Sequence, residues 1–182
     1  MAKSYPIPCT KEEMDALLEK SSVNEFYYTL FMVAKTTGRR LGEIYDVKVK
    51  DFDSSKGILV TKVLKRRKKV EKEAIVTPEV SRLLKVYILK NKLKLEDYIF
   101  QKVSYRQIQY MVKSFAKKAN IKHNVSFHNF RHYLITELVR KGWSYDKIAK
   151  LTGHSSVGTI SAYDHAVASD IKEDALEALQ DL

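Results

Sequence analysis

Extended patterning occupies one short stretch of this chain, and the remainder carries the periodicity and the capping residues of helices. The β-branched run 58–63 and a second extended run, 70–76, flank five consecutive basic residues, 65–69. This arrangement predicts a charged β-hairpin. The sequence therefore predicts an α+β fold that is mostly helical, with a small antiparallel β-hairpin or sheet.

Helix signals precede the hairpin. Thr10 with Glu13 three residues later is typical of a capping box, which predicts that a helix begins there. Apolar residues recur at helical spacing from Glu25 onward, and Gly38 is suited to end that helix in the left-handed conformation. A short helix is expected over residues 41–45.

Helix signals also follow the hairpin. Thr77 before Pro78 predicts a helix start, and Gly142 is suited to end a later helix. Further N-caps are predicted at Ser104, Ser126, Ser144, Ser155 or Ser156, and Ser169. The last of these helices, 169–182, is acidic with an apolar stripe, so it could cover its own core or dock on a neighbouring subunit. No repeat or long linker divides the chain, and we expect a single domain, 1–182.

The composition favours a polyanionic partner. Lys and Arg total 33 against 22 Asp and Glu, a net charge of +11, which suits nucleic acid or an anionic membrane. No run of about 18 apolar residues occurs and the first residues lack the apolar core of a signal peptide, so we expect a cytoplasmic protein with no membrane partner. The lone Cys9 has no second cysteine and is far in sequence from any histidine, so no role, metal or cofactor is expected.

Taken singly, each chemically versatile residue has an ordinary structural explanation. His128 and Arg131 lie three residues apart on one helix face, a spacing that is common for capping or surface contacts. Arg40 with its neighbour Arg39 could compensate the dipole at a helix C-terminus. Tyr163 is one of 11 tyrosines, most of which must be packing residues.

Together, these residues are the set that metal-free phosphoryl transfer requires. A hydroxyl attacks phosphorus, guanidinium groups neutralise the non-bridging oxygens, imidazoles move protons, and an ammonium protonates the departing oxygen. A free tyrosine has a pKa of about 10, so it needs neighbouring positive charge to attack at neutral pH. The residues that could fill these roles are Tyr163, Arg40, Arg131, His128, His154 and Lys65.

Four motifs, in this order, resemble the catalytic domain of the tyrosine recombinases of the phage-integrase and Xer type. They are Thr-Gly-Arg-Arg-Leu-Gly-Glu-Ile at 37–44, His-Asn-Phe-Arg-His at 128–132, Leu-Thr-Gly-His-Ser-Ser at 151–156, and a tyrosine nine residues after His154. The resemblance implies that Arg40 and Arg131 clamp the phosphate, supported by Glu43, and that His132 is a packing neighbour. It further implies catalytic roles for His128, His154 and the nucleophile Tyr163.

The family carries a catalytic lysine on its β-hairpin, and here Lys65 resembles it best, with Lys62 and Lys68 as alternatives. The basic hairpin residues expected to bind DNA are Lys62, Arg66, Arg67, Lys68 and Lys69. The resemblance implies cleavage and rejoining of double-stranded DNA through a 3′-phosphotyrosyl intermediate, without metal or cofactor. It also implies a homo-oligomer, a tetramer on paired DNA sites, and an N-terminal core-binding domain that this sequence does not contain.

Three alternatives remain open from the sequence. Residues 144–155 resemble the opening of a helix-turn-helix, which would make the chain a non-catalytic DNA-binding regulator. A recombinase-like fold that binds DNA without cutting it is a second alternative. A type IB topoisomerase shares the same chemistry, although the Gly-His-Ser segment resembles the recombinases more closely.

Overall fold

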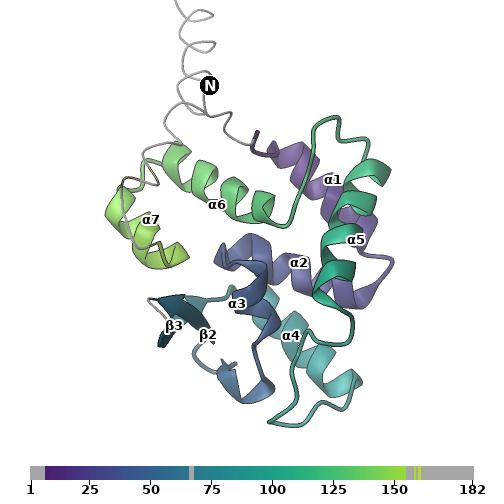
Figure 1. Ribbon diagram of the computed structural model, residues 1–182, viewed down its shortest axis with the longest axis vertical. Helices are drawn as coiled ribbons and strands as arrows, with labels where there is room; N and C mark the ends of the chain where they lie inside the picture. Colours follow the sequence, from purple (N-terminus) through teal and green to yellow (C-terminus); the bar gives the residue numbers. More distant parts are fainter. Residues whose placement is uncertain (1–6, 66–67, 155–157, 159, 161–182) are drawn as a thin grey trace, which may run out of the picture.

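The computed structural model describes residues 7–65, 68–154, 158 and 160, and it is mostly helical with one small antiparallel sheet (Figure 1). The predicted α+β class is confirmed. The elements are α1 Lys11–Ser21, α2 Glu25–Thr37, α3 Leu41–Tyr45, the 3-10 turn η1 Val49–Asp51, β1 Phe52–Asp53, β2 Ile58–Lys65, β3 Lys68–Ile75, α4 Pro78–Lys90, α5 Tyr105–Lys118, α6 His128–Arg140 and α7 Tyr145–Thr152. Every helix in the described part of the chain is too short or too polar to span a bilayer.

The predicted helix starts at Thr10 and Thr77 are confirmed, because their caps are made by residues within one turn. The Thr10 hydroxyl accepts from the Glu13 amide while the Glu13 carboxylate accepts from the Thr10 amide, which completes the capping box of α1. The Thr77 hydroxyl accepts from the Val80 amide at the start of α4. Gly38 ends α2 at φ +60°, as predicted.

The start of α6 differs from the expectation. Ser126 is not its N-cap, because α6 begins at His128 and the preceding Phe127 offers no capping side chain. Instead, the Ser126 amide and hydroxyl both donate to the Asn129 side-chain oxygen. The carboxamide is thus the acceptor at this helix start, a role that the sequence pattern assigned to the serine.

The sheet is larger than the predicted hairpin. Antiparallel pairing of β2 with β3 runs from Ile58↔Ile75 to Lys65↔Lys68, and the two-residue strand β1 pairs with β2. The predicted extended runs were 58–63 and 70–76, and the strands are longer, because Lys65, Lys68 and Lys69 of the basic stretch also pair. A backbone ladder needs no particular side chain, so lysines do not stop it.

Two apolar clusters form the interior and meet along α6. The larger cluster is rich in aromatic rings, and Phe31 at its centre packs against Phe115, Phe127 and Phe130 with ring centroids 5.0 to 6.3 Å apart. The smaller cluster joins the C-terminal half of α6 to α7 and consists of Ile135, Leu138, Ile148, Ala149 and Ile160. Polar residues where the two clusters meet can therefore contact segments of both clusters.

Candidate active site

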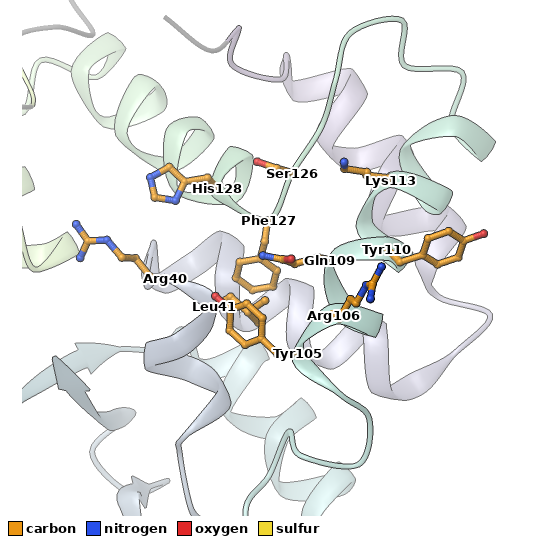
Figure 2. A pocket seen from close by; sticks show the side chains of 10 residues that line it. All are labelled: Arg40, Leu41, Tyr105, Arg106, Gln109, Tyr110, Lys113, Ser126, Phe127 and His128. Carbon is orange, nitrogen blue, oxygen red and sulfur yellow. The ribbon is translucent and has the colours of Figure 1, made fainter. Parts of the chain in front are cut away.

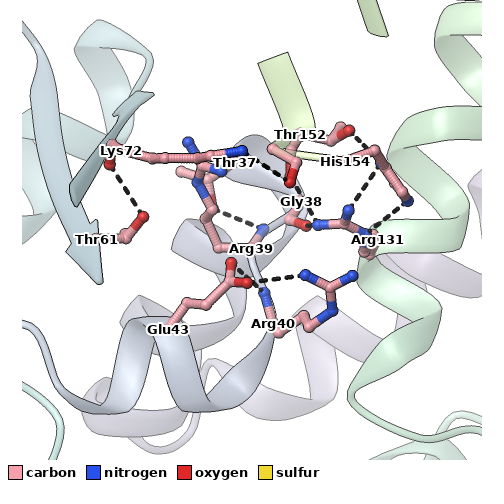
Figure 3. Close-up of polar contacts among 11 residues, drawn as sticks. Thr37, Gly38, Arg39, Arg40, Glu43, Thr61, Lys72, Arg131, Thr152 and His154 are labelled. Carbon is pink, nitrogen blue, oxygen red and sulfur yellow. Dashed lines mark hydrogen bonds and ion pairs between the residues drawn. The ribbon is translucent and has the colours of Figure 1, made fainter. Parts of the chain in front are cut away.

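Arg131 is fixed at the border of the two clusters by helix ends that are distant in sequence. Its side chain is 1% exposed, and Nη1 donates to the carbonyl oxygens of Gly38 and Thr152, each at 2.7 Å (Figure 3). These carbonyls lie at the C-terminal ends of α2 and α7, where helices leave acceptors unpaired and carry partial negative charge. The guanidinium is therefore held in one orientation by the fold itself.

His154 lies against this guanidinium. Gly153, at φ +74°, ends α7 and turns the chain so that Nδ1 of His154 is 2.7 Å from Nη2 of Arg131. Arg131 Nε also lies 3.3 Å from Nε2 of the same ring, and because arginine can only donate, the guanidinium presents a donor to each ring nitrogen of His154. Burial and then the charges of Arg131 and Arg40 lower the pKa of His154 to about 3, so the ring is neutral at pH 7.

Arg40 is more open than Arg131. It precedes α3, and its side chain, 47% exposed, bonds through Nη1 to Oε1 of the buried Glu43 at 2.9 Å (Figure 3). The second Glu43 oxygen accepts from the Arg40 amide at 3.2 Å. Glu43 thereby orients the arginine at both its backbone and its head group, while part of the guanidinium still faces solvent.

His128 is the first residue of α6 and is exposed to solvent. Burial of its ring, followed by the charges of Arg131 and Arg40, lowers its pKa. One turn later His132 packs edge-to-face against it, with ring centroids 5.0 Å apart, and burial lowers the pKa of His132 to about 4. Arg40, His128, Arg131 and His154 are thus close enough to interact electrostatically, and together they form a cluster of two cations and two neutral imidazoles that suits a phosphate.

The remaining predicted site residues are described in part or not at all. Lys65 is the last residue of β2 and pairs with Lys68. Tyr163, Arg66, Arg67 and the helix 169–182 lie outside the described residues.

A groove beside Arg40 and His128 was missed by the sequence reasoning. The cavity has a volume of about 490 Å³, and its far wall is the exposed face of α5, with Arg106, Tyr110 and Lys113 (Figure 2). These residues recur every three or four positions, on the face opposite the buried Ile108 and Val112 of the same helix. That polar periodicity was the available signal, and it adds a basic wall to the pocket.

One group of potential metal ligands occurs among the described residues, away from the arginines. Tertiary structure brings His123 to Cys9 and Glu13, with all three ligand atoms within 4.8 Å of one another and His123 Nε2 3.0 Å from Glu13 Oε2. Burial and then Glu13 raise the pKa of the Cys9 thiol to about 12, so the thiolate that binds metals is disfavoured. The group is accounted for as a half-buried ion pair beside a packed thiol.

Comparison with known proteins gives consistent results at the level of family and fold. The model of the phage integrase family matches residues 9–169. A tyrosine recombinase of Pseudothermotoga lettingae is 28% identical over 170 residues, covering 92% of this chain and 58% of the relative. The tyrosine recombinase XerA of Pyrococcus furiosus is 26% identical over 182 residues, covering 94% and 61%. The chain thus spans roughly three fifths of these relatives.

Solved structures share the fold. The crystal structure of XerA recombinase matches with a TM-score of 0.80 and 27% identity, over 96% of this chain and 66% of that one. A post-cleavage complex of the XerH site-specific recombinase with its difH substrate matches with a TM-score of 0.79 and 21% identity, covering 94% and 53%. A lambda integrase tetramer on a Holliday junction matches with a TM-score of 0.68 and 16% identity, covering 90% and 49%. The last two likenesses speak for the fold alone.

Proposed function

Because the chain belongs to the phage integrase family, we propose that it is the catalytic domain of a tyrosine recombinase and that it cleaves and rejoins DNA through a 3′-phosphotyrosyl intermediate. The observation that carries this proposal is the cluster in which Arg40 and Arg131 interact with two imidazoles, those of His128 and His154. Arg131 is fixed before any substrate binds, and preorganised donors of this kind stabilise the charge of a transition state most effectively.

In the proposed reaction, the Tyr163 oxygen attacks phosphorus and the bond to the 5′-oxygen breaks. The tyrosine proton passes to His128, whose lowered pKa leaves the ring neutral and able to accept it. Lys65 supplies a proton to the departing 5′-oxygen, and His154 forms a hydrogen bond with the phosphate. Attack of a second 5′-hydroxyl on the phosphotyrosine reverses these steps and joins the new strand.

The choice of Lys65 over the other hairpin lysines is part of this proposal. Its position at the end of β2, about two dozen residues after Arg40, supports it, because the family resemblance is best there. Lys68, paired with Lys65, remains the alternative.

We propose double-stranded DNA as the partner, bound by two basic surfaces. One is the hairpin with Lys62, Arg66, Arg67, Lys68 and Lys69, and the other is the α5 wall of the groove. Affinity from such phosphate contacts should fall steeply with added salt. Assembly as a tetramer on paired sites is proposed by analogy with lambda integrase, with 169–182 as a docking helix, 1–182 as one catalytic domain, and the cytoplasm as the place of action.

The helix-turn-helix alternative explains less of the molecule. The C-terminal carbonyl of α7, at Thr152, holds Arg131, and the helix buries Ile148, Ala149 and Thr152 against its neighbours. A DNA-reading motif has no need for a buried arginine at that end.

A covalent-complex assay tests the proposal. The chain is incubated with a nicked duplex that traps the intermediate, and a denaturing gel is examined for a protein–DNA adduct. We expect an adduct with the unmodified chain and with the control Tyr98→Phe, and none with Tyr163→Phe. An adduct that persists in Tyr163→Phe would show that another residue is the nucleophile.

Arg131→Met tests the clamp in the same assay. Loss of one preorganised donor should slow adduct formation by about 10²–10³-fold, whereas the exposed Arg82→Met on α4 should leave the rate unchanged. Circular dichroism of each variant separates a catalytic loss from unfolding. Equal rates for Arg131→Met and the unmodified chain would remove Arg131 from the mechanism.

A further inference from the structure

Arg39 is a buried cation that the proposed mechanism does not use. Its side chain is 1% exposed, and one head-group nitrogen, Nη2, donates to the carbonyl oxygen of Glu73 on β3. Within the described part of the chain, Nε and Nη1 are buried without any hydrogen-bond partner. Leaving such donors unpaired is costly, because they lose water and gain nothing in return.

Among the described residues, Arg39 forms no ion pair of its own. Burial lowers the pKa of Arg39, and the carboxylate that opposes this effect in the described part of the chain, Glu43, already binds Arg40 (Figure 3). An uncompensated buried charge is far less stable than a paired one, so the site favours an external anion.

A second cation stands beside Arg39. A Cβ atom placed on Gly153 would lie 3.2 Å from Arg39 Cζ and 3.6 Å from Lys72 Cδ, so both side chains pack against the same backbone atom. The Lys72 ammonium is 3.3 Å from the Gly153 carbonyl oxygen. Two like charges side by side repel each other, and an anion between them relieves the repulsion.

A cavity of about 370 Å³ opens onto these groups, and Arg39, Lys72, Lys150 and His154 all line it. The carboxyl groups of Glu73 and Asp146 also belong to the wall, but both residues are exposed to solvent. Because His154 is shared with the Arg131 pocket, the cavity adjoins the place proposed for the scissile phosphate. An anion bound here would therefore be next to the one that reacts.

We propose that Arg39 and Lys72 form a second phosphate site, which binds the DNA backbone phosphate adjacent to the scissile one. This inference rests on the proposed function, and it adds a subsite that positions the strand. The carbonyl oxygen of Glu73 accepts from Arg39 and that of Gly153 accepts from Lys72, which holds the two cations in place. Its occupation supplies the unpaired Arg39 donors with acceptors.

The test places one neutral methylphosphonate at each phosphate around the cleavage position and measures equilibrium binding by a Tyr163→Phe chain, which cannot be trapped covalently. We expect one flanking substitution to weaken binding about tenfold, the loss of one charge-assisted contact. When Arg39→Met or Lys72→Met is added to the Tyr163→Phe chain, the methylphosphonate at that position should no longer weaken binding. The exposed Arg82→Met is the matched control and should keep it.

Two further readouts distinguish this subsite from a structural role. Arg39→Met should lower the salt slope of log affinity by about 0.9, one phosphate contact, and its thermal stability without DNA should stay equal or rise, because a buried unpaired charge has been removed. A variant that weakens binding equally at every phosphate, or that unfolds at lower temperature with an unchanged slope, would overturn the inference.

Inorganic phosphate tests whether the site binds a free anion instead of a DNA phosphate. Stabilisation of the unmodified chain but not of Arg39→Met by phosphate, without any position-dependent methylphosphonate effect, would assign the site to free phosphate and refute the DNA contact. The covalent-complex assay reports separately on the proposed function. If the adduct forms normally but no methylphosphonate position depends on Arg39 or Lys72, only the second site is rejected. If one position does depend on them but no adduct forms, only the proposed chemistry is rejected.

Discussion

The two apolar clusters differ in size and in what they contribute to the candidate site. The larger cluster is rich in packed aromatic rings, and it supports Arg40 and the start of α6, where His128 lies. The smaller one carries α7 and, at its end, Thr152 and His154. Arg131 belongs to α6 but bonds to Gly38 on the first side and to Thr152 and His154 on the second.

This difference teaches that the site depends on alignment of the two clusters more than on the stability of either one. The hydrogen bond from Arg131 to Gly38 can survive a shift of α7, but the contact between Arg131 and His154 cannot. Stability and cleavage should therefore respond differently to damage in the two clusters.

The largest expected effect is on global stability. Phe31→Ala in the larger cluster should lower the free energy of unfolding by about 3–5 kcal/mol, and Ile148→Ala in the smaller cluster by about 2 kcal/mol, at the low end for such a truncation. Both side chains are fully buried in the native state. Urea unfolding followed by circular dichroism measures the two losses.

Cleavage should rank these two variants in the opposite order. At a temperature where both are folded, Ile148→Ala should slow adduct formation more than Phe31→Ala, because it loosens the helix that ends at His154. A larger cleavage defect in Phe31→Ala would show that the two clusters behave as one unit.

A smaller effect concerns Gly38, where the clusters touch. Its φ is +60°, and an added Cβ would lie 2.9 Å from Leu134 Cδ2 and 3.2 Å from Thr152 Cγ2. Gly142 is a matched control, since its φ is +72° but no heavy atom lies within 4 Å of the added Cβ. We expect Gly142→Ala to cost about 1–2 kcal/mol from backbone strain alone, and Gly38→Ala about 1 kcal/mol more from crowding. If thermal unfolding shows equal losses of stability for the two variants, the residues around Gly38 repack freely.

The last expected effect is the pH dependence of stability. The pKa of His154 is lowered to about 3 and that of His132 to about 4, below the ordinary value of 6.5. The unfolded chain therefore binds more protons than the native one as pH falls from about 6.5 to 4, so the native state loses stability in that window. Each histidine contributes at most about 1.4 kcal/mol per pH unit, and less where solvent reaches the ring.

Substitution of either ring should make this pH dependence shallower. His154→Gln and His132→Gln should each reduce the slope of unfolding free energy between pH 6 and 4, since the carboxylates contribute equally in all three chains. Unchanged slopes in both variants would contradict neutral histidines in the native state.

Local features of the fold could be predicted because their partners are close in sequence. The capping box of Thr10 and Glu13 and the left-handed end at Gly38 each involve residues within one helical turn. The same logic failed at Ser126, where two equally local polar groups competed and Asn129 became the acceptor. It also missed β1, because a strand of two residues carries no periodic signal.

The sequence by itself determined the helical class of the fold, most helix boundaries, and, through its ordered motifs, the family. Only the tertiary structure decided that Gly38 and Thr152 would hold Arg131, that His123 would meet Cys9, and that Arg39 would be buried near Lys72 with two of its donors unpaired among the described residues. These contacts join residues from 20 to more than 100 positions apart. A residue's type fixes the interactions available to it, but its charge state and partners depend on which distant segments packing brings to it.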